Sequence, residues 1–292
     1  MSMSPEHVTK KRRSSGIAII GMSWLTMTLG LFFATLAGEF ISTIVVAAEW
    51  MVHLTQAVVI ISIVLPVLFV IRRHFHMKSV LLPLTGKSII HLLSGALFAT
   101  SLAFIGLAIA SMNNWITITE WHFSAEFLLA VVLNSCIAFL YEALPEELSM
   151  RGMVYDGLRS RLRLPVFFAY VTQIILFLLV PMSVGLLQEL VGMDAGNRIT
   201  LDYMALLLTY GITLQLLRSL TGSLWASIGF HVAYLEVARF VVMPGDRPAL
   251  LSYTAQDNGL AEIFILYIMI IFVGGIILAV LNAWRWWRIH KS

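Results

Sequence analysis

Two adjacent glutamates and a nearby arginine stand out in the run YEALPEELSMRG, because the surrounding chain is mostly apolar. Glu147 and Arg151 are four residues apart, so on a helix they share a face and can form an ion pair. Glu142 and Glu146 have the same spacing on a neighbouring face, where the like charges repel. Repulsion and dehydration both favour the protonated form of a carboxyl group, which poises one carboxylate to accept a proton from water near neutral pH. The run therefore predicts a site of water activation.

The same acidic residues also fit a purely structural role. Pro145 suits the first position of a helix, and acidic residues directly after it favour the helix dipole. Glu146 and Glu147 are therefore also consistent with a plain helix start. Charge at the edge of a membrane-spanning segment is costly and usually functional, which favours the chemical role.

His231 is the second candidate, and it lies in the apolar run LTGSLWASIGFHVAYLEVARF. A histidine inside a helical bundle can serve packing alone by donating a hydrogen bond to a neighbouring helix. If it faces a carboxylate of another helix, it can instead bind a metal, polarise a water or stabilise an oxyanion during acyl transfer. The sequence leaves these roles open, and we expect the two polar groups to form one buried site assembled from separate helices.

The composition is that of an integral membrane protein. Hydrophobic residues make up 59% of the 292 residues, charged residues only 12%, and the mean hydropathy is +0.89. A soluble domain would carry roughly 25% charged residues. We therefore predict an all-α polytopic membrane bundle in which residues 1–292 form a single integral-membrane domain. Eight apolar segments are long enough to span a bilayer: 16–38, 52–71, 88–111, 124–143, 166–188, 203–219, 223–243 and 258–283.

The sixth and seventh segments are nearly continuous and form either a tight hairpin or one interrupted span. The turn signal Leu220-Thr221-Gly222-Ser223 favours the hairpin. The first segment follows a basic stretch, but it is about twice as long as a signal-peptide core, so we expect a retained helix.

Basic clusters at alternate segment ends predict that both termini are cytoplasmic, because positive residues in short loops favour that side. The net charge of +3 is explained by these clusters facing an anionic leaflet, so nucleic-acid binding is not implied. The clusters are Lys10 to Arg13; Arg72, Arg73 and Lys78; Arg151, Arg159, Arg161 and Arg163; Arg218; and Arg285, Arg288 and Lys291.

The cysteine content excludes two kinds of cysteine chemistry within this sequence. Cys136 is the single cysteine, which rules out an intrachain disulfide and a cysteine-based zinc cluster within this sequence. Its place in an apolar helix is typical of packing. The sequence contains no glycine-rich phosphate loop, so we expect no nucleotide partner.

The run Glu146-Glu147-Leu-Ser-Met-Arg151-Gly152, a gap of about 80 residues, and the run Ser219-Leu-Thr-Gly-Ser-Leu-Trp225 before His231 resemble the CPBP family of intramembrane proteases. This family includes the CAAX prenyl endopeptidases of the Rce1 type and bacterial relatives, also called Abi proteins, linked to bacteriocin immunity or protein scaffolding. The resemblance covers mainly residues 124–243.

The resemblance implies a helical bundle whose polar cavity opens toward the cytoplasmic leaflet, with a glutamate that activates water for peptide hydrolysis. Glu146 matches that glutamate, and Glu147 and Arg151 complete the first motif. His231 matches the histidine of the third motif, which in the family helps to hold the oxyanion or a metal. If a divalent metal such as zinc is bound, Glu146 and His231 are its expected ligands.

Two positions depart from the family pattern. The second motif, a phenylalanine followed four residues later by histidine, should fall at Phe177, but the fourth position holds Pro181. The third motif continues from histidine to asparagine or aspartate four residues on, where this chain has Leu235 followed by Glu236. Three side chains remain as candidate substitutes, namely Gln173, which cannot accept a proton at neutral pH, His91 and Glu236.

We expect an intramembrane endopeptidase that cleaves a membrane protein or a lipidated peptide near the cytoplasmic leaflet of a bacterial plasma membrane. The lost second-motif histidine favours an alternative, a pseudo-protease that serves as a membrane scaffold, immunity or binding protein, because losing an acid/base partner costs about 10² to 10⁴ in rate. A small-molecule transporter would explain the Pro181 interruption, but such proteins tend to show a repeated half that is not evident here.

Overall fold

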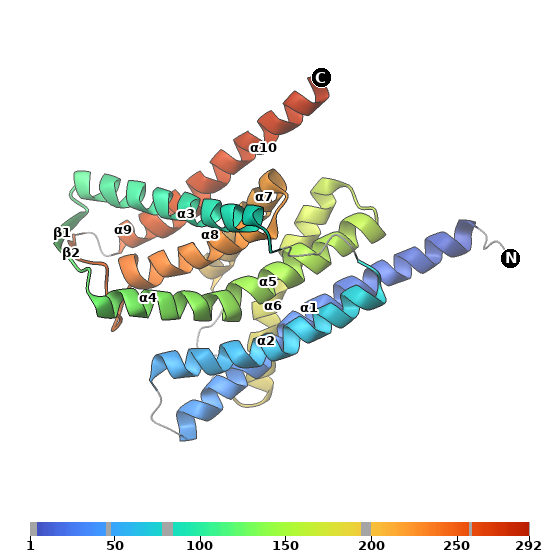
Figure 1. Cartoon of the computed structure of the whole chain (residues 1–292), viewed down its shortest axis with the longest axis horizontal. Helices are drawn as coiled ribbons and strands as arrows, with labels where there is room; N and C mark the ends of the chain where they lie inside the picture. The colour runs from blue at the N-terminus through green and yellow to red at the C-terminus, as the bar shows by residue number, and fades with distance from the viewer. Residues whose placement is uncertain (1–4, 45–47, 78–83, 194–199, 257–258, 292) are drawn as a thin grey trace. The chain divides into compact units, whose positions relative to one another are not determined.

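The computed structural model describes residues 5–44, 48–77, 84–193, 200–256 and 259–291, with side chains from Arg13 onward (Figure 1). Nearly all of these residues are helical. The main helices are α1 (Pro5–Ile44), α2 (Glu49–His74), α3 (Gly86–Met112), α4 (Ala125–Ala138), α6 (Val166–Leu190), α7 (Leu201–Thr221), α8 (Leu224–Val237) and α10 (Gly274–Lys291). Shorter elements are α5 (Leu144–Glu146), α9 (Leu260–Ile263) and the π-helical stretches η1 (Phe139–Ala143), η2 (Glu147–Val154), η3 (Gly157–Arg161), η4 (Ala238–Val242) and η5 (Phe264–Val273).

Within the described part of the chain, seven helices have the length and apolar composition needed to cross a membrane. This confirms the prediction of a multi-pass membrane protein. The seven are Arg13–Ile44, Glu49–His74, Gly86–Met112, Ala125–Arg161, Val166–Leu190, Leu201–Thr221 and Leu260–Lys291. The predicted segment 223–243 is also helical, as α8 and η4, but it is not among the seven. His231, Glu236 and Arg239 lower its apolar character.

The predicted segment 124–143 ends too early. The helix that begins at Ala125 runs on through Pro145 to Arg161, as α4, η1, α5, η2 and η3. Proline inside a helix lacks a hydrogen-bond donor, and membrane helices tolerate it through local π adjustments of the kind that flank Pro145 here. Glu146 and Glu147 therefore lie in the middle of a long helix, and their interpretation as a helix start is wrong.

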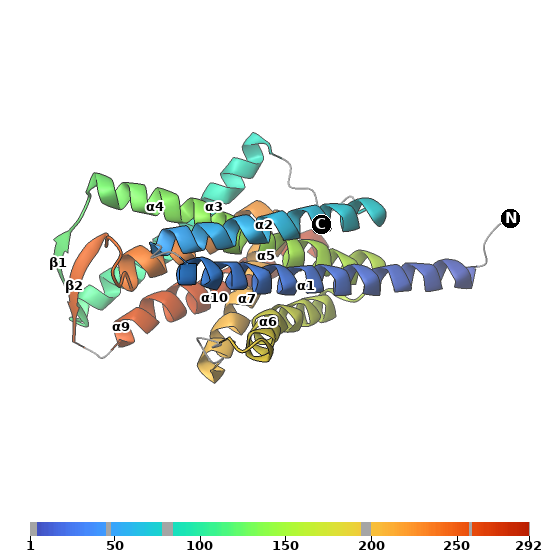
Figure 2. The ribbon, with the colours of Figure 1, turned by 90° about the horizontal axis from the view of Figure 1, so that it is seen from below.

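Two short strands interrupt the all-α pattern. β1 (Ile116–Trp121) pairs antiparallel with β2 (Leu251–Ala255), and Figure 2 shows the two side by side. The paired residues include Ile116 with Ala255 and Trp121 with Leu251. Strand β1 lies in the loop after α3, which the sequence analysis left without structure because the partner strand is more than 100 residues away.

The chain divides into two compact units that interleave along the sequence. Unit 1 comprises residues up to Leu82 and Leu140–Leu208, and unit 2 comprises Pro83–Phe139 and the residues from Thr209 onward. The long helix Ala125–Arg161 and α7 each pass from one unit into the other. The prediction of a single integral-membrane domain stays a prediction.

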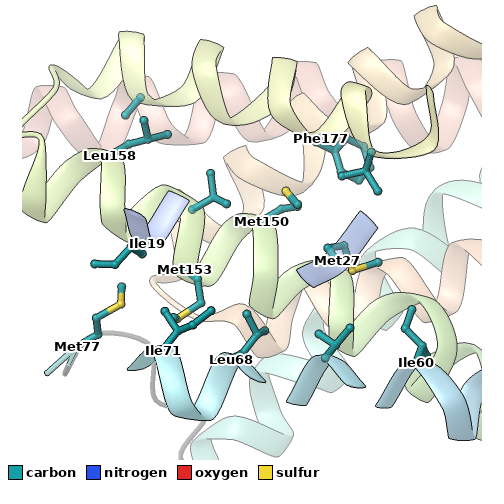
Figure 3. Close-up of a cluster of buried hydrophobic side chains, with 14 of the residues drawn as sticks. Ile19, Met27, Ile60, Leu68, Ile71, Met77, Met150, Met153, Leu158 and Phe177 are labelled. Carbon is teal, nitrogen blue, oxygen red and sulfur yellow. The ribbon is translucent and has the colours of Figure 1, made fainter. Parts of the chain in front are cut away.

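Unit 1 packs α1, α2, α6 and the π-helical stretches η2 and η3 around one apolar core (Figure 3). The core side chains include Ile19 and Met27 of α1, Ile60 of α2, Met153 of η2 and Phe177 of α6. They project from helices that are far apart in sequence and hold η2 in place.

The basic clusters at the ends of α2 and of the long helix Ala125–Arg161 lie close together in unit 1. The Arg161 guanidinium donates to the carbonyl oxygen of Phe75, just after α2, and Gly16 of α1 abuts Leu162. The clusters at 72–73 and 159–163 therefore share one end of the unit, as predicted. Arg151 is different, because it is fully buried and cannot act as a loop charge. Lys78 lies outside the described residues, and the cytoplasmic orientation of the termini remains a prediction.

Unit 2 is built on a close crossing of α3 and α8. A Cβ atom added at Gly95 would lie 1.9 Å from the carbonyl oxygen of Ala226, and one added at Gly229 would lie 1.9 Å from that of Leu92. The two glycines thus allow the backbones to touch, as small residues do between membrane helices.

We expect Gly229→Ala to destabilise the protein, because its Cβ would collide with backbone rather than with a flexible side chain. Forced overpacking of this kind costs about 1–3 kcal/mol. The measurement is the thermal unfolding midpoint in detergent, with Gly185→Ala as the matched control, since a Cβ at Gly185 meets nothing within 4 Å. Equal midpoints for the two variants would contradict the close crossing.

The helices α7 and α8 form the predicted hairpin. Gly222 has a φ of +70°, a conformation that glycine adopts readily, and it separates Thr221 from the helix that begins at Leu224. Tyr210 and Tyr234 stand at similar distances from this turn, and their ring centroids are 4.9 Å apart. This contact confirms that the two helices run antiparallel.

Candidate functional site

Glu147 and Arg151 form an ion pair in the core of unit 1. Arg151 Nη1 donates to Glu147 Oε1 at 2.5 Å, and neither side chain is exposed to solvent. The guanidinium carbon of Arg151 also lies 4.8 Å from the ring centroid of Phe177 on α6, within the range of a cation–π contact. The predicted pairing is therefore present. Its full burial means that each charge depends on the other, because an isolated buried charge is strongly unfavourable.

Glu146 has different surroundings from its neighbour, because successive helical residues point in different directions. It is partly exposed, whereas Glu147 is fully buried. Both Glu146 and Glu142 lie within electrostatic range of Tyr203, near the start of α7. The two adjacent carboxylates are thus separated into one neutralised by Arg151 and one that is not part of that pair.

Tyr203 was not predicted from the sequence as a neighbour of the acidic motif. A tyrosine at the start of an apolar segment has no local feature that links it to an acidic motif more than 50 residues earlier. Only the packing of α7 in unit 1 brings it near Glu142 and Glu146. Its hydroxyl group is a hydrogen-bond donor that a carboxylate can use.

His231 lies on α8 in unit 2 and is only 3% exposed. The ring of Tyr210 meets it edge to face, with a centroid distance of 5.3 Å and an interplanar angle of 88°. Tyr210 in turn packs against Tyr234, one turn after His231. The α7–α8 hairpin therefore packs the imidazole ring of His231 against Tyr210, a contact that was not predicted from the sequence.

The region expected to hold the second motif lies on α6. Pro181 is inside the helix, and Phe177 contacts Arg151 as described. Gln173 lies one turn before Phe177 and is fully buried; neither amide atom has a hydrogen-bond partner in the part of the chain that the structure describes. The phenylalanine of the motif is thus packed against the first motif, while the histidine position is a proline.

The third-motif region also departs from expectation. Glu236 accepts a hydrogen bond of 2.5 Å from Asn134 Nδ2 on α4, so it faces a different helix from the one that packs on His231. Both Glu236 and Cys136 line a hollow of about 440 Å³ between α3, α4 and α8. Cys136 is exposed there, so its predicted packing role is wrong.

The structure places three of the four predicted site residues in unit 1 and the fourth in unit 2. Glu147 and Arg151 pair in unit 1, next to Glu146, whereas His231 belongs to unit 2. That Glu146 and His231 face one cavity remains a prediction. No group of three or more His, Cys, Asp or Glu side chains suited to a metal ion occurs among the described residues. A zinc site usually needs at least three protein ligands, so this donor set does not fit that metal well.

One comparison with known proteins found a similarity in the part of the chain that carries the buried charged motif. Residues 124–235 match the family described as type II CAAX prenyl endopeptidase Rce1-like. This region contains all four predicted site residues, and it is similar to the Rce1-like family of CAAX-type intramembrane proteases. Comparisons with curated proteins and with solved structures gave no match.

Proposed function

We propose that the protein is an intramembrane endopeptidase that uses Glu146 to activate water. One observation carries the proposal: of the two adjacent carboxylates, Glu147 is neutralised by Arg151 in the core, whereas Glu146 stays outside that pair and partly exposed. A general base must be reachable by water and able to accept a proton, and Glu146 fits this requirement better than Glu147.

In the proposed reaction, the Glu146 carboxylate takes one proton from a water molecule while the water oxygen attacks the peptide carbonyl carbon. The carbonyl oxygen becomes an oxyanion, which His231 stabilises by donating a hydrogen bond. When the carbon–nitrogen bond breaks, the proton held by Glu146 passes to the leaving nitrogen. The products are a carboxylic acid, which loses its proton to the solvent, and an amine, and Glu146 is restored.

Glu147 and Arg151 have a positioning role in this proposal. Their ion pair ties η2 to the core, and the contact of Arg151 with Phe177 ties η2 to α6. Because Glu146 directly precedes Glu147, this anchoring fixes the backbone from which Glu146 projects. If a divalent metal takes part, Glu146 and His231 are its expected ligands, but the proposed steps do not use one.

The family suggests a substrate that is a membrane protein or a lipidated peptide, cut near the cytoplasmic leaflet. A bilayer-embedded enzyme meets such a substrate by diffusion in the membrane. We place the protein in the plasma membrane of a bacterium, in line with the bacterial relatives that the sequence resembles. Nucleotides and nucleic acids have no part in this proposal.

An inactive scaffold is the second candidate, because Pro181 and Leu235 replace residues that the family uses near its site. In that case the buried pair of Glu147 and Arg151 would be retained for folding alone, and a lipidated partner would be held without being cut. This candidate predicts that Glu146 is dispensable.

The proposal is tested by cleavage in proteoliposomes. Purified protein is mixed with a peptide carrying an isoprenyl-cysteine near its C-terminus, and mass spectrometry follows new peptide ends. We expect cleavage by the native protein and cleavage slower by about 10² to 10⁴ in Glu146→Gln at equal amounts of folded protein. The same peptide without the lipid shows whether lipidation is required. Cleavage that persists in Glu146→Gln would contradict the assigned role of Glu146.

A further inference from the structure

The interior of unit 1 contains polar atoms whose hydrogen-bonding capacity the described residues do not meet. Gln173 is fully buried, and its amide oxygen and nitrogen both lack a partner there. Arg151 uses Nη1 for Glu147, while its Nε and Nη2 have no acceptor among the same residues. The buried hydroxyl of Ser23 on α1 also has no hydrogen-bond partner among these residues. Buried polar groups almost always bond to protein or to ordered water.

Contacts on both sides of Gln173 place it opposite the helix that carries Arg151. On one side, the Phe177 ring lies 4.8 Å from the Arg151 guanidinium carbon. On the other side, the rings of Tyr155 and Tyr170 are 5.4 Å apart. Since α6 runs antiparallel to that helix, Gln173 lies between these two contacts, about one turn from Phe177 and on the same face.

Ser23 is fully buried on α1, and residues next to it on that helix contact α6 or the core of unit 1. Its neighbour Trp24 donates from Nε1 to the carbonyl oxygen of Leu176 at 2.8 Å, three residues after Gln173. Ile19, one turn before Ser23, belongs to the buried cluster that also contains Phe177 (Figure 3). The stretch η2 and helix α6 thus bring the unpaired donors of Arg151 and the unpaired acceptor of Gln173 to one level of the core, and α1 packs against both.

We infer that unit 1 binds an ordered internal water molecule at Gln173. The water accepts hydrogen bonds from Nε and Nη2 of Arg151 and donates to Gln173 Oε1. Three hydrogen bonds are the usual number for a buried water. The water gives Arg151 an acceptor that the protein itself does not supply and so completes the buried ion pair with Glu147. The site does not depend on the proposed peptide hydrolysis.

The test is hydroxyl-radical footprinting by X-ray radiolysis, read by mass spectrometry, because radicals form from bound water and modify the side chains beside it. Met153 and Phe177 are the reporters, since they are 1% and 5% exposed and bulk water does not reach them. We expect both to be modified in the native full-length protein and their modification to fall severalfold in Gln173→Leu. Met269, buried in unit 2, serves as an internal reference.

The matched control is Gln56→Leu on α2, because the Gln56 amide oxygen already lies 3.0 Å from His53 Nδ1. Modification of Met153 and Phe177 should be unchanged in this variant. If Gln173→Leu does not fold, modification of Met153 and Phe177 in the native protein is the test. Absence of modification at both reporters overturns the inference.

Discussion

Arg151→Met should destabilise the protein by about 3–5 kcal/mol, because it removes the guanidinium that neutralises the buried Glu147 carboxylate. Glu147 and Arg151 are both fully buried and 2.5 Å apart. The expected result is a large drop in the thermal unfolding midpoint in detergent and a low yield of folded protein. Arg73→Met is the matched control, since Arg73 is exposed at the end of α2, and this change should have little effect.

A double variant separates loss of the pair from loss of packing. Glu147→Leu combined with Arg151→Met replaces both charges by apolar side chains of similar size, and such replacements are often neutral or stabilising. We expect the double variant to be more stable than Arg151→Met alone. If the two single changes added in the double variant, the ion pair would not be the reason for the loss, and the structural role given to Glu147 and Arg151 would be wrong.

The second large effect is on catalysis. Glu146→Gln should lower the rate of peptide cleavage by about 10² to 10⁴, because it removes the general base. The glutamine has the same shape and Glu146 is only partly buried, so the unfolding midpoint should stay close to that of the native protein. The measurement is the cleavage rate in proteoliposomes alongside the unfolding midpoint of each sample.

Glu147→Gln is the comparison for that result. It removes a charge from the buried pair and leaves Arg151 unpaired, so it should lower the unfolding midpoint more than Glu146→Gln does. Glu146→Gln is therefore expected to lower the cleavage rate with little change in the unfolding midpoint, whereas Glu147→Gln is expected to lower the unfolding midpoint. Equal loss of stability in both variants would show that their different burial has no consequence, and the assignment of Glu146 as the base would lose its support.

The sequence predicted the membrane class, most helices and the pairing of Glu147 with Arg151, because apolar runs and four-residue spacing are local features. It did not predict that the helix continues through Pro145. Proline usually ends a helix in water, and the π-helical turns that accommodate it here are not visible in composition. The strands β1 and β2 were missed for a related reason, since each one is short and is stabilised only by its distant partner.

The neighbours of the site residues also could not be predicted from the sequence. Tyr203 is near Glu146, and Tyr210 packs on His231, because tertiary packing brings α7 beside these residues in the respective units. Gln173 was considered as a substitute for the missing histidine. Its complete burial without a protein partner became evident only from the packing of α1, η2 and α6.

The most direct test of the central claim is a comparison of membrane-protein termini in cells that carry the native chain, a deletion, or Glu146→Ala at matched expression. If Glu146 is the catalytic base, the same set of termini will disappear in the deletion and in Glu146→Ala, and these termini will name the substrate. If Glu146→Ala restores every property lost in the deletion and no terminus changes, the protein is a scaffold, and the proposed peptide hydrolysis is wrong.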